Sequence, residues 1–293
     1  MKIALINCVT LPEPDPDERP LLDALLQAGH EARSAAWDDQ GVDWSGFDAG
    51  VFRATWDYHT RPEAFQAWLD VTAGKTRLLN GADAVRWNSH KRYLTHFEDR
   101  RLPIVPTLWR ARDADPSAES TDDPIADAVA RGWTKLVVKP SVSAGSRDTR
   151  VFDVGADASN EDAISFARAL RRREDIMVQR YMTSVASGGE TALVTIGGVL
   201  SHAIRKYPRF AGQDERVELC AEIGEAERRF AGAVLDACPF DTLYARVDIM
   251  RDDDGGIMLS ELELIEPSLF FWLAPGSARR MVNAIESRLA NPV

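Results

Sequence analysis

Four charged side chains in two short segments of the C-terminal third could bind a metal ion together. Arg246 and Asp248 alternate with apolar residues in the first segment, and Glu261 and Glu263 do so in the second. Three carboxylates that converge beside one arginine repel one another unless a cation joins them. All-oxygen ligands select a hard cation, which we expect to be magnesium, with manganese as the alternative, shared with nucleotide phosphates. A solvated acidic strand face is the alternative interpretation.

The spacing of these segments predicts a β-hairpin whose loop covers residues 251–256. Such a loop places Asp248 opposite Leu259 and Arg246 opposite Glu261, so the four charged side chains share one face. A loop one residue longer would break this arrangement. The opposite face would then be apolar and suited to packing: Val247, Ile249, Met258, Leu262 and Leu264.

A lysine at the end of another predicted strand opens a second candidate site. Lys139 ends an apolar run and is followed by a loop with small and hydroxyl-bearing residues: Ser141, Ser143, Gly145 and Ser146. Backbone N–H groups and hydroxyls can donate to phosphate oxygens, and the lysine supplies a positive charge. The segment could therefore wrap a triphosphate, although an ordinary turn is the alternative interpretation.

The composition is that of a folded chain with more than one lobe. The 293 residues include 45% apolar and 28% charged residues, a balance typical of globular proteins. Lys and Arg number 35 against 46 Asp and Glu, and the net charge of -11 argues against a nucleic-acid partner. The three cysteines are scattered and lack zinc-site spacing, which favours a reducing cytoplasm. Neither a membrane-length apolar run nor a signal-peptide cleavage site is evident, so we expect no membrane association.

Strand and helix patterns alternate over residues 1–88 and predict a small parallel α/β lobe. Apolar runs predict three strands: Lys2–Val9, Ala49–Phe52 and Leu78–Asn80. Helical spacing predicts a helix over Pro20–Gly29, and Thr60–Glu63 has the pattern of a capping box that opens another. The turn at Leu11–Asp15 is acidic and has no glycine, so neither a dinucleotide-binding loop nor a Walker loop is available there.

The remainder of the chain predicts an α+β arrangement. Three more strands are expected: Lys135–Lys139, Val151–Val154 and Ile176–Met182. A helix is expected over residues 160–170, and the polar, acidic stretch Ala111–Pro124 is interpreted as a surface loop. Gly197-Gly198 predicts the turn of a hairpin formed by Thr191–Ile196 and Val199–Ile204.

Together these residues resemble the ATP-grasp superfamily over most of the chain. Five motifs occur in the expected order: Asn88-Ser89-His90-Lys91, Val138-Lys139-Pro140, Val178-Gln179-Arg180-Tyr181-Met182, Gly189-Glu190-Thr191, and the pair Arg246-Val247-Asp248 with Glu261-Leu262-Glu263. The sequence departs from the superfamily at Glu263, where an asparagine is usual, and in a phosphate loop that is poorer in glycine.

The resemblance implies an α/β fold combined with α+β lobes that sandwich ATP. The expected division is an N-terminal lobe at residues 1–88, a central lobe at 89–180 and a C-terminal lobe with the metal-binding hairpin at 181–293. Relatives phosphorylate a substrate carboxylate with ATP, and a nitrogen then attacks the acylphosphate. The chain therefore resembles an ATP-dependent carboxylate–amine ligase, with a non-catalytic nucleotide-binding regulator as the alternative.

Site roles follow from the same resemblance. It assigns contacts as follows: Lys91 and Lys139 with the phosphate loop for the phosphates, Gln179, Arg180, Tyr181 and Met182 for adenine, Glu190 near the ribose, and Asp248, Glu261 and Glu263 for magnesium. Arg246 and Arg216 are the candidates to stabilise the transferred phosphoryl group or the tetrahedral intermediate. A surface position is the alternative for Arg216.

The finer resemblance is to the subgroup of glutathione synthetase and ribosomal-protein glutamate ligase, which the cycloserine-forming cyclo-ligases resemble as well. Five residues are assigned to the substrate: Arg53, Trp56, Asp57, Tyr58 and Ser268. Arginine suits a carboxylate and aspartate an ammonium group, so the expected substrate is a small amino-acid-like molecule such as O-ureido-serine. Packing between lobes is the alternative for Trp56 and Tyr58. Intramolecular ring closure and intermolecular ligation, including ligation onto a protein tail, remain open, and resemblance implies a homodimer.

Overall fold

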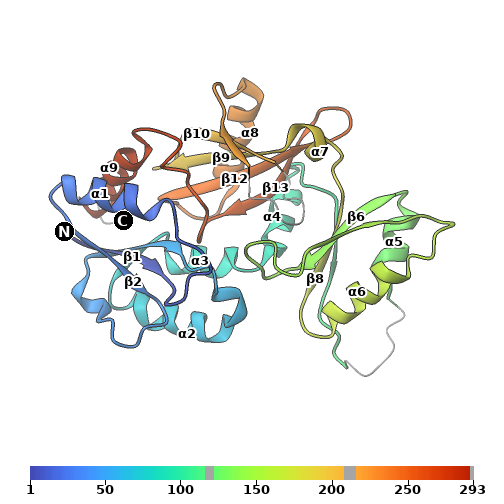
Figure 1. The fold of residues 1–293 in the computed structure, drawn as a ribbon, viewed down its shortest axis with the longest axis horizontal. Coiled ribbons are helices and arrows are strands. Elements are labelled where there is room, and N and C mark those ends of the chain that lie inside the picture. Colours follow the sequence, from blue (N-terminus) through green and yellow to red (C-terminus); the bar gives the residue numbers. More distant parts are fainter. Residues whose placement is uncertain (116–121, 208–215, 291–293) are drawn as a thin grey trace.

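Three β-sheets organise the chain, and the computed structural model describes residues 1–115, 122–207 and 216–290. Figure 1 shows the sheet that contains β6 and β8 set apart on the right, with the other two sheets together on the left and centre.

The first sheet is parallel and has the strand order β2-β1-β3-β4. Its strands are β1 (Lys2–Asn7), β2 (Glu31–Ala36), β3 (Ala49–Ala54) and β4 (Arg77–Leu79), with helices α1 (Glu18–Gln27) and α2 (Pro62–Ala73). Strand β2 was not predicted because its sequence is polar and only Ala35 is fully buried. The capping box is wrong: Arg61 caps α2, and the Thr60 hydroxyl donates instead to the Asp57 carbonyl at 2.8 Å.

The second sheet is antiparallel, in the order β5-β8-β6-β7. Its elements are β5 (Thr107–Arg110), α5 (Pro124–Ala130), β6 (Lys135–Pro140), β7 (Arg150–Asp153), α6 (Glu161–Arg171) and β8 (Ile176–Arg180). Alternate residues of β6 and β8 pack on α5 and α6, which leaves Lys139 on the other face of the sheet. The surface loop expected at 111–124 includes residues 116–121, which lie outside the described part, and α5 begins at its end.

The third sheet is antiparallel, in the order β11-β10-β9-β12-β13. Its elements are α7 (Ser184–Gly188), β9 (Glu190–Ile196), β10 (Val199–Lys206), β11 (Val217–Leu219), α8 (Glu225–Ala237), β12 (Tyr244–Arg251), β13 (Ile257–Glu263) and α9 (Ser277–Ala290). The Gly197-Gly198 turn is confirmed, and both glycines have positive φ values, 62° and 77°.

The first and third sheets share one hydrophobic core. Residues of β1 and α1 pack with residues of β9, β12 and α9, and α9 lies beside α1 near both chain ends (Figure 1). Short helices lead from the first sheet to the second: α3 (Ala82–Asn88), η3 (Lys91–Tyr93) and α4 (Leu94–Glu98). Across the ranges that the structure describes, no helix has the length and apolar character needed to cross a membrane.

Candidate active site

The charged residues of β12 and β13 do share a face, but through a different register from the predicted one. Arg246 pairs with Glu263 and Asp248 with Glu261, so the predicted pairs of Asp248 with Leu259 and Arg246 with Glu261 are wrong. The loop is one residue shorter than expected, which alone would turn both glutamates to the opposite face. A bulge at Ser260 adds one residue to β13 and returns them to the face of Asp248.

The hairpin of β9 and β10 also contains a bulge that shifts its register. Its register shifts between Leu200 and His202, and the extra residue places Lys206, rather than Arg205, opposite Glu190. Because β9 also pairs with β12, this shift brings Lys206 to the face that carries Asp248.

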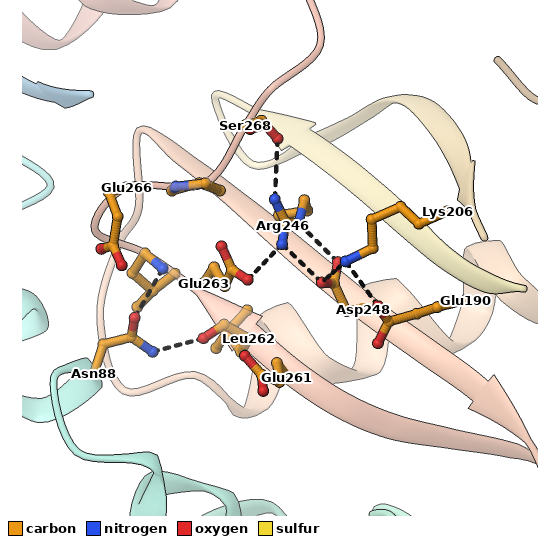
Figure 2. Close-up of polar contacts among 12 residues, drawn as sticks. Asn88, Glu190, Lys206, Arg246, Asp248, Glu261, Leu262, Glu263, Glu266 and Ser268 are labelled. Atoms are coloured by element: carbon orange, nitrogen blue, oxygen red, sulfur yellow. Dashed lines mark hydrogen bonds and ion pairs between the residues drawn. The ribbon is translucent and has the colours of Figure 1, made fainter. Parts of the chain in front are cut away.

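Arg246 is the centre of the charged cluster. Its Nε and Nη2 atoms donate to the two oxygens of Asp248, each at 2.9 Å, and Nη2 also donates to Glu263. A third nitrogen, Nη1, donates to the Ser268 carbonyl at 3.3 Å (Figure 2). Arg246 is 7% exposed, and its guanidinium is held by the two carboxylates and by the Ser268 carbonyl.

Lys206 extends this cluster along the sheet. Its ammonium lies 2.6 Å from an Asp248 oxygen and 2.7 Å from a Glu190 oxygen (Figure 2). Burial and Arg246 disfavour the charged form of Lys206, but the two carboxylates outweigh them and raise its pKa. Burial would by itself raise the pKa of Asp248, yet Arg246 and Lys206 hold it below its usual range.

The two motif lysines meet at Glu261. Nζ of Lys91 and Nζ of Lys139 each lie 2.7 Å from one of its carboxylate oxygens, although Lys139 comes from the second sheet and Glu261 from the third. Burial would raise the pKa of Glu261, but the two ammonium groups outweigh it and hold the pKa far below its usual range. This contact therefore joins the faces of two sheets around a site for anionic groups.

Asn88 docks the first lysine motif onto β13. Its amide Nδ2 donates to the Leu262 carbonyl at 2.7 Å, and its Oδ1 accepts from the Leu264 N–H at 2.9 Å. The Tyr93 hydroxyl accepts from the Leu262 N–H at 2.8 Å. These bonds satisfy the outer edge of β13 and fix Lys91 beside Glu261.

Residues 266–271 form a loop after β13 that is held from the N-terminal sheet. Buried Asp17 accepts hydrogen bonds from three consecutive N–H groups, those of residues 269–271, at 2.6, 2.8 and 2.6 Å. Arg53 donates to the Pro267 carbonyl at 2.9 Å and lies 3.5 Å from Asp17. The convergence of these N–H groups requires a positive φ of 53° at Phe270, so Asp17 maintains an otherwise unfavourable backbone.

The comparisons with known proteins agree with this geometry. A family profile described as the N-terminal domain of D-cycloserine synthetase DcsG matches residues 3–80. The chain is 33% identical over 301 residues to the cycloserine biosynthesis protein DcsG of Streptomyces lavendulae, with 98% of both proteins covered. The chain belongs to the DcsG family of ATP-grasp ligases.

Solved structures confirm the fold of this DcsG-family chain. The crystal structure of D-cycloserine synthetase DcsG matches with a TM-score of 0.87 and 31% identity, over 99% of this chain and 100% of the other. The ATP complex of D-alanine–D-alanine ligase from Bacillus anthracis shares the fold, with a TM-score of 0.69, 14% identity and coverage of 99% and 97%. The predicted superfamily, fold class and enzyme class are confirmed: the chain is an ATP-dependent ligase.

The structure of this DcsG-family ligase separates the phosphate-loop residues into two pairs. Ser141 and Ser143 are buried, and Ser143 donates to the Pro140 carbonyl at 3.4 Å. Gly145 and Ser146 are exposed at the tip, both with positive φ, 58° and 59°. The structure therefore exposes the tip pair and buries the two serines that precede it.

The hinge residues lie at the end of β8. Gln179 is buried and donates to the Thr107 hydroxyl at 3.0 Å, whereas Arg180 pairs with Asp253 on the loop between β12 and β13. Tyr181 and Met182 follow, with the Tyr181 ring 4.8 Å from the ammonium of Lys135. The backbone N–H groups of Arg180 and Tyr181 also have partners, since they donate to the Pro106 and Lys135 carbonyls.

The candidate substrate residues of the N-terminal sheet lie deeper than expected. Arg53 is 2% exposed and Tyr58 4%, with Tyr58 in the aromatic core beside Phe65. Asp57 accepts from the Trp37 indole at 2.8 Å and pairs with Arg61. For Tyr58 the packing interpretation is therefore favoured, and Arg53 contacts the 266–271 loop.

Trp56 and Ser268 border that same loop. The Trp56 indole lies 3.4 Å from the Glu266 carbonyl, and the Ser268 carbonyl accepts from Arg246. Arg216 lies apart: its exposed guanidinium pairs with Glu218 and stacks on Tyr207. The structure thus does not bring Arg216 to Arg246, which favours the surface interpretation.

A metal ion would need the carboxylates of this cluster to change partners. Within residues 1–115, 122–207 and 216–290, no three His, Cys, Asp or Glu side chains are grouped closely enough to hold a metal. Asp248, Glu261 and Glu263 nevertheless provide an all-oxygen donor set of the type that magnesium prefers. In this structure, lysine ammonium groups and the Arg246 guanidinium neutralise the negative charge of these carboxylates. The donor chemistry fits once nucleotide phosphates bind the lysines.

Three residues of the site were not predicted: Lys206, Asp17 and Glu266. Glu266 lies three residues after the end of β13, and burial together with Glu263 raises its pKa to about 8. The folded protein therefore retains a proton that the unfolded chain releases at lower pH, and ionising Glu266 costs stability as the pH rises from the usual value towards 8.

We expect Glu266→Gln to stabilise the ligand-free protein more at high pH than at low pH, since the amide removes this cost. Tm should rise by a few degrees at about pH 8.5 and stay nearly unchanged at about pH 4. Thermal denaturation at both pH values measures the difference, with Glu222→Gln on the surface as the matched control. Equal changes in Tm at both pH values would contradict the raised pKa.

Proposed function

We propose that this chain closes O-ureido-serine into the cycloserine ring at the expense of ATP. The observation that carries the proposal is the 33% identity to the cycloserine biosynthesis protein DcsG over 98% of both chains, together with the Arg246 cluster. The carboxylate of the substrate attacks the terminal phosphorus, and ADP leaves. The nitrogen attached to the side-chain oxygen then attacks the acyl carbon and expels phosphate. Its carbamoyl group must also be lost, which consumes one water and yields carbon dioxide and ammonia.

In this proposal ATP lies between the second and third sheets. Lys91 and Lys139 each contact one oxygen of Glu261, so phosphate oxygens can replace the carboxylate as their partner. Lys206 supplies a third positive charge at the edge of the same face. The division into lobes at residues 1–88, 89–180 and 181–293 is part of the proposal, because it assigns the second and third sheets to separate lobes on either side of ATP.

Asp248, Glu261 and Glu263 would hold magnesium, which when bound would offset the negative charge of the terminal phosphates. Arg246 keeps a rigid, planar set of donors beside these carboxylates and beside the 266–271 loop. There it can stabilise the transferred phosphoryl group and the oxyanion that forms as the nitrogen attacks. Asp17 and Arg53 hold the loop in place for this step.

The test is a turnover measurement on the purified protein with ATP, magnesium and each enantiomer of O-ureido-serine. We expect ADP and cycloserine in equal amounts by mass spectrometry, and loss of both when magnesium is chelated. A conjugate that forms only with a second amine would indicate intermolecular ligation. ATP binding without turnover of either enantiomer would contradict the proposal.

A further inference from the structure

One carboxylate of the site has no cation beside it. Glu261 binds two lysines, Asp248 binds Arg246 and Lys206, and Glu263 binds Arg246. Across the described ranges, Glu266 forms neither an ion pair nor a hydrogen bond with another side chain. A carboxyl group that is partly withdrawn from water favours a cationic partner when it ionises, and Glu266 has none among these side chains.

Glu266 is held at a defined place next to the reacting groups. Glu266 lies three residues beyond Glu263, the last residue of β13. In Figure 2 it lies on the side of Glu263 opposite to Asp248. The backbone around Glu266 is held by three hydrogen bonds. Trp56 donates to the Glu266 carbonyl, and Arg53 and Arg246 donate to the carbonyls of residues 267 and 268.

An amino-acid substrate places its ammonium group close to the carboxylate that is phosphorylated. The nitrogen is separated from the carboxyl carbon by one atom, roughly 2.5 Å, from standard bond lengths. Whatever binds the ammonium group must therefore border the site of phosphoryl transfer. Glu266, which lies next to Glu263 at the edge of the charged cluster (Figure 2), meets this requirement.

We propose that Glu266 binds the α-ammonium group of the substrate and so selects an amino acid over the corresponding deaminated acid. This inference rests on the proposed function and deepens it. The other acidic candidates are occupied: Asp57 is bound by Trp37 and Arg61, and Glu263 by Arg246. Charge pairing with Glu266 leaves Arg246 and the lysines for the carboxylate and the phosphates.

The experiment is a cycle of two enzymes and two substrates. Wild-type and Glu266→Gln proteins are assayed with O-ureido-serine and with 3-(ureidooxy)propanoate, which lacks only the ammonium group. We expect Glu266→Gln to raise KM for O-ureido-serine at least tenfold and to change KM for ATP less than twofold. Deamination should cost the wild type at least tenfold in kcat/KM, but the variant less than threefold.

Each outcome bears on one proposal. Equal penalties for deamination in both proteins, or wild-type KM in the variant, would overturn the role of Glu266 while leaving the ligase reaction intact. No turnover of O-ureido-serine by the wild type would overturn the proposed function and this inference with it. Glu266→Asp and the surface control Glu222→Gln, each checked by thermal denaturation, separate loss of the carboxylate's position from loss of folding.

Discussion

Replacing Arg246 with alanine is expected to lower kcat by about a hundredfold to a thousandfold, the usual loss when a fixed donor to a developing charge is removed. The side chain supplies donors to Asp248, Glu263 and the Ser268 carbonyl at once. Without it, buried Asp248 and half-buried Glu263 face each other with less compensation, and the 266–271 loop loses one of its links to the third sheet, leaving that of His202 with the Leu269 carbonyl. ADP release at saturating ATP and substrate measures the effect.

Two further substitutions make this result specific. Arg246→Lys keeps the charge but not the planar arrangement of donors, so an intermediate rate is expected. Arg251→Ala removes an exposed arginine of the same strand, which pairs with Glu227, and should leave kcat unchanged. If Arg246→Ala retained kcat within fivefold while binding ATP normally, Arg246 would have no role in the chemical step.

The sequence predicted which charged residues share a face, but not how they come to share it. Residues two apart on a strand lie on the same face. Arg246 and Asp248 therefore share a face with Glu261 and Glu263 in any register that differs from the predicted one by an even number of residues. The structure reaches that alignment through a shorter loop and a bulge at Ser260, two changes that cancel. Nothing in the residues around Ser260 distinguishes a bulge from a regular strand, so only the three-dimensional pairing reveals it.

Lys206 and Asp17 were missed for a related reason. Lys206 reaches Asp248 across 42 residues, and only because a bulge near Ser201 shifts the register of β10. Asp17 contacts a loop 252 residues away, and a single aspartate at the start of a helix is usually a cap. The two-glycine turn by itself would place Arg205 opposite Glu190, and only the bulge in β10 replaces it with Lys206.

We expect Asp17→Ala to lower the free energy of unfolding by about 3–5 kcal/mol, the range typical of breaking a buried ion pair. The substitution leaves three buried N–H groups at residues 269–271 without an acceptor and leaves Arg53 without its carboxylate. Burial raises the pKa of Asp17, which shows that desolvation of its carboxylate offsets part of the stabilisation from these contacts. We therefore expect a loss in the lower half of this range. Thermal denaturation should show Tm falling by roughly 5–10 °C.

The control for Asp17 is Asp23→Ala in helix α1. Among the described residues, Asp23 forms an ion pair only with Arg19, at the protein surface. Its removal should leave Tm unchanged. Asp17→Asn should fall between the two, because the amide retains one acceptor oxygen but presents N–H groups to at least one backbone donor. Equal Tm values for Asp17→Ala and Asp23→Ala would mean that the 266–271 loop keeps its conformation unaided. The positive φ of Phe270 argues against that result, since such a backbone persists only where surrounding contacts maintain it.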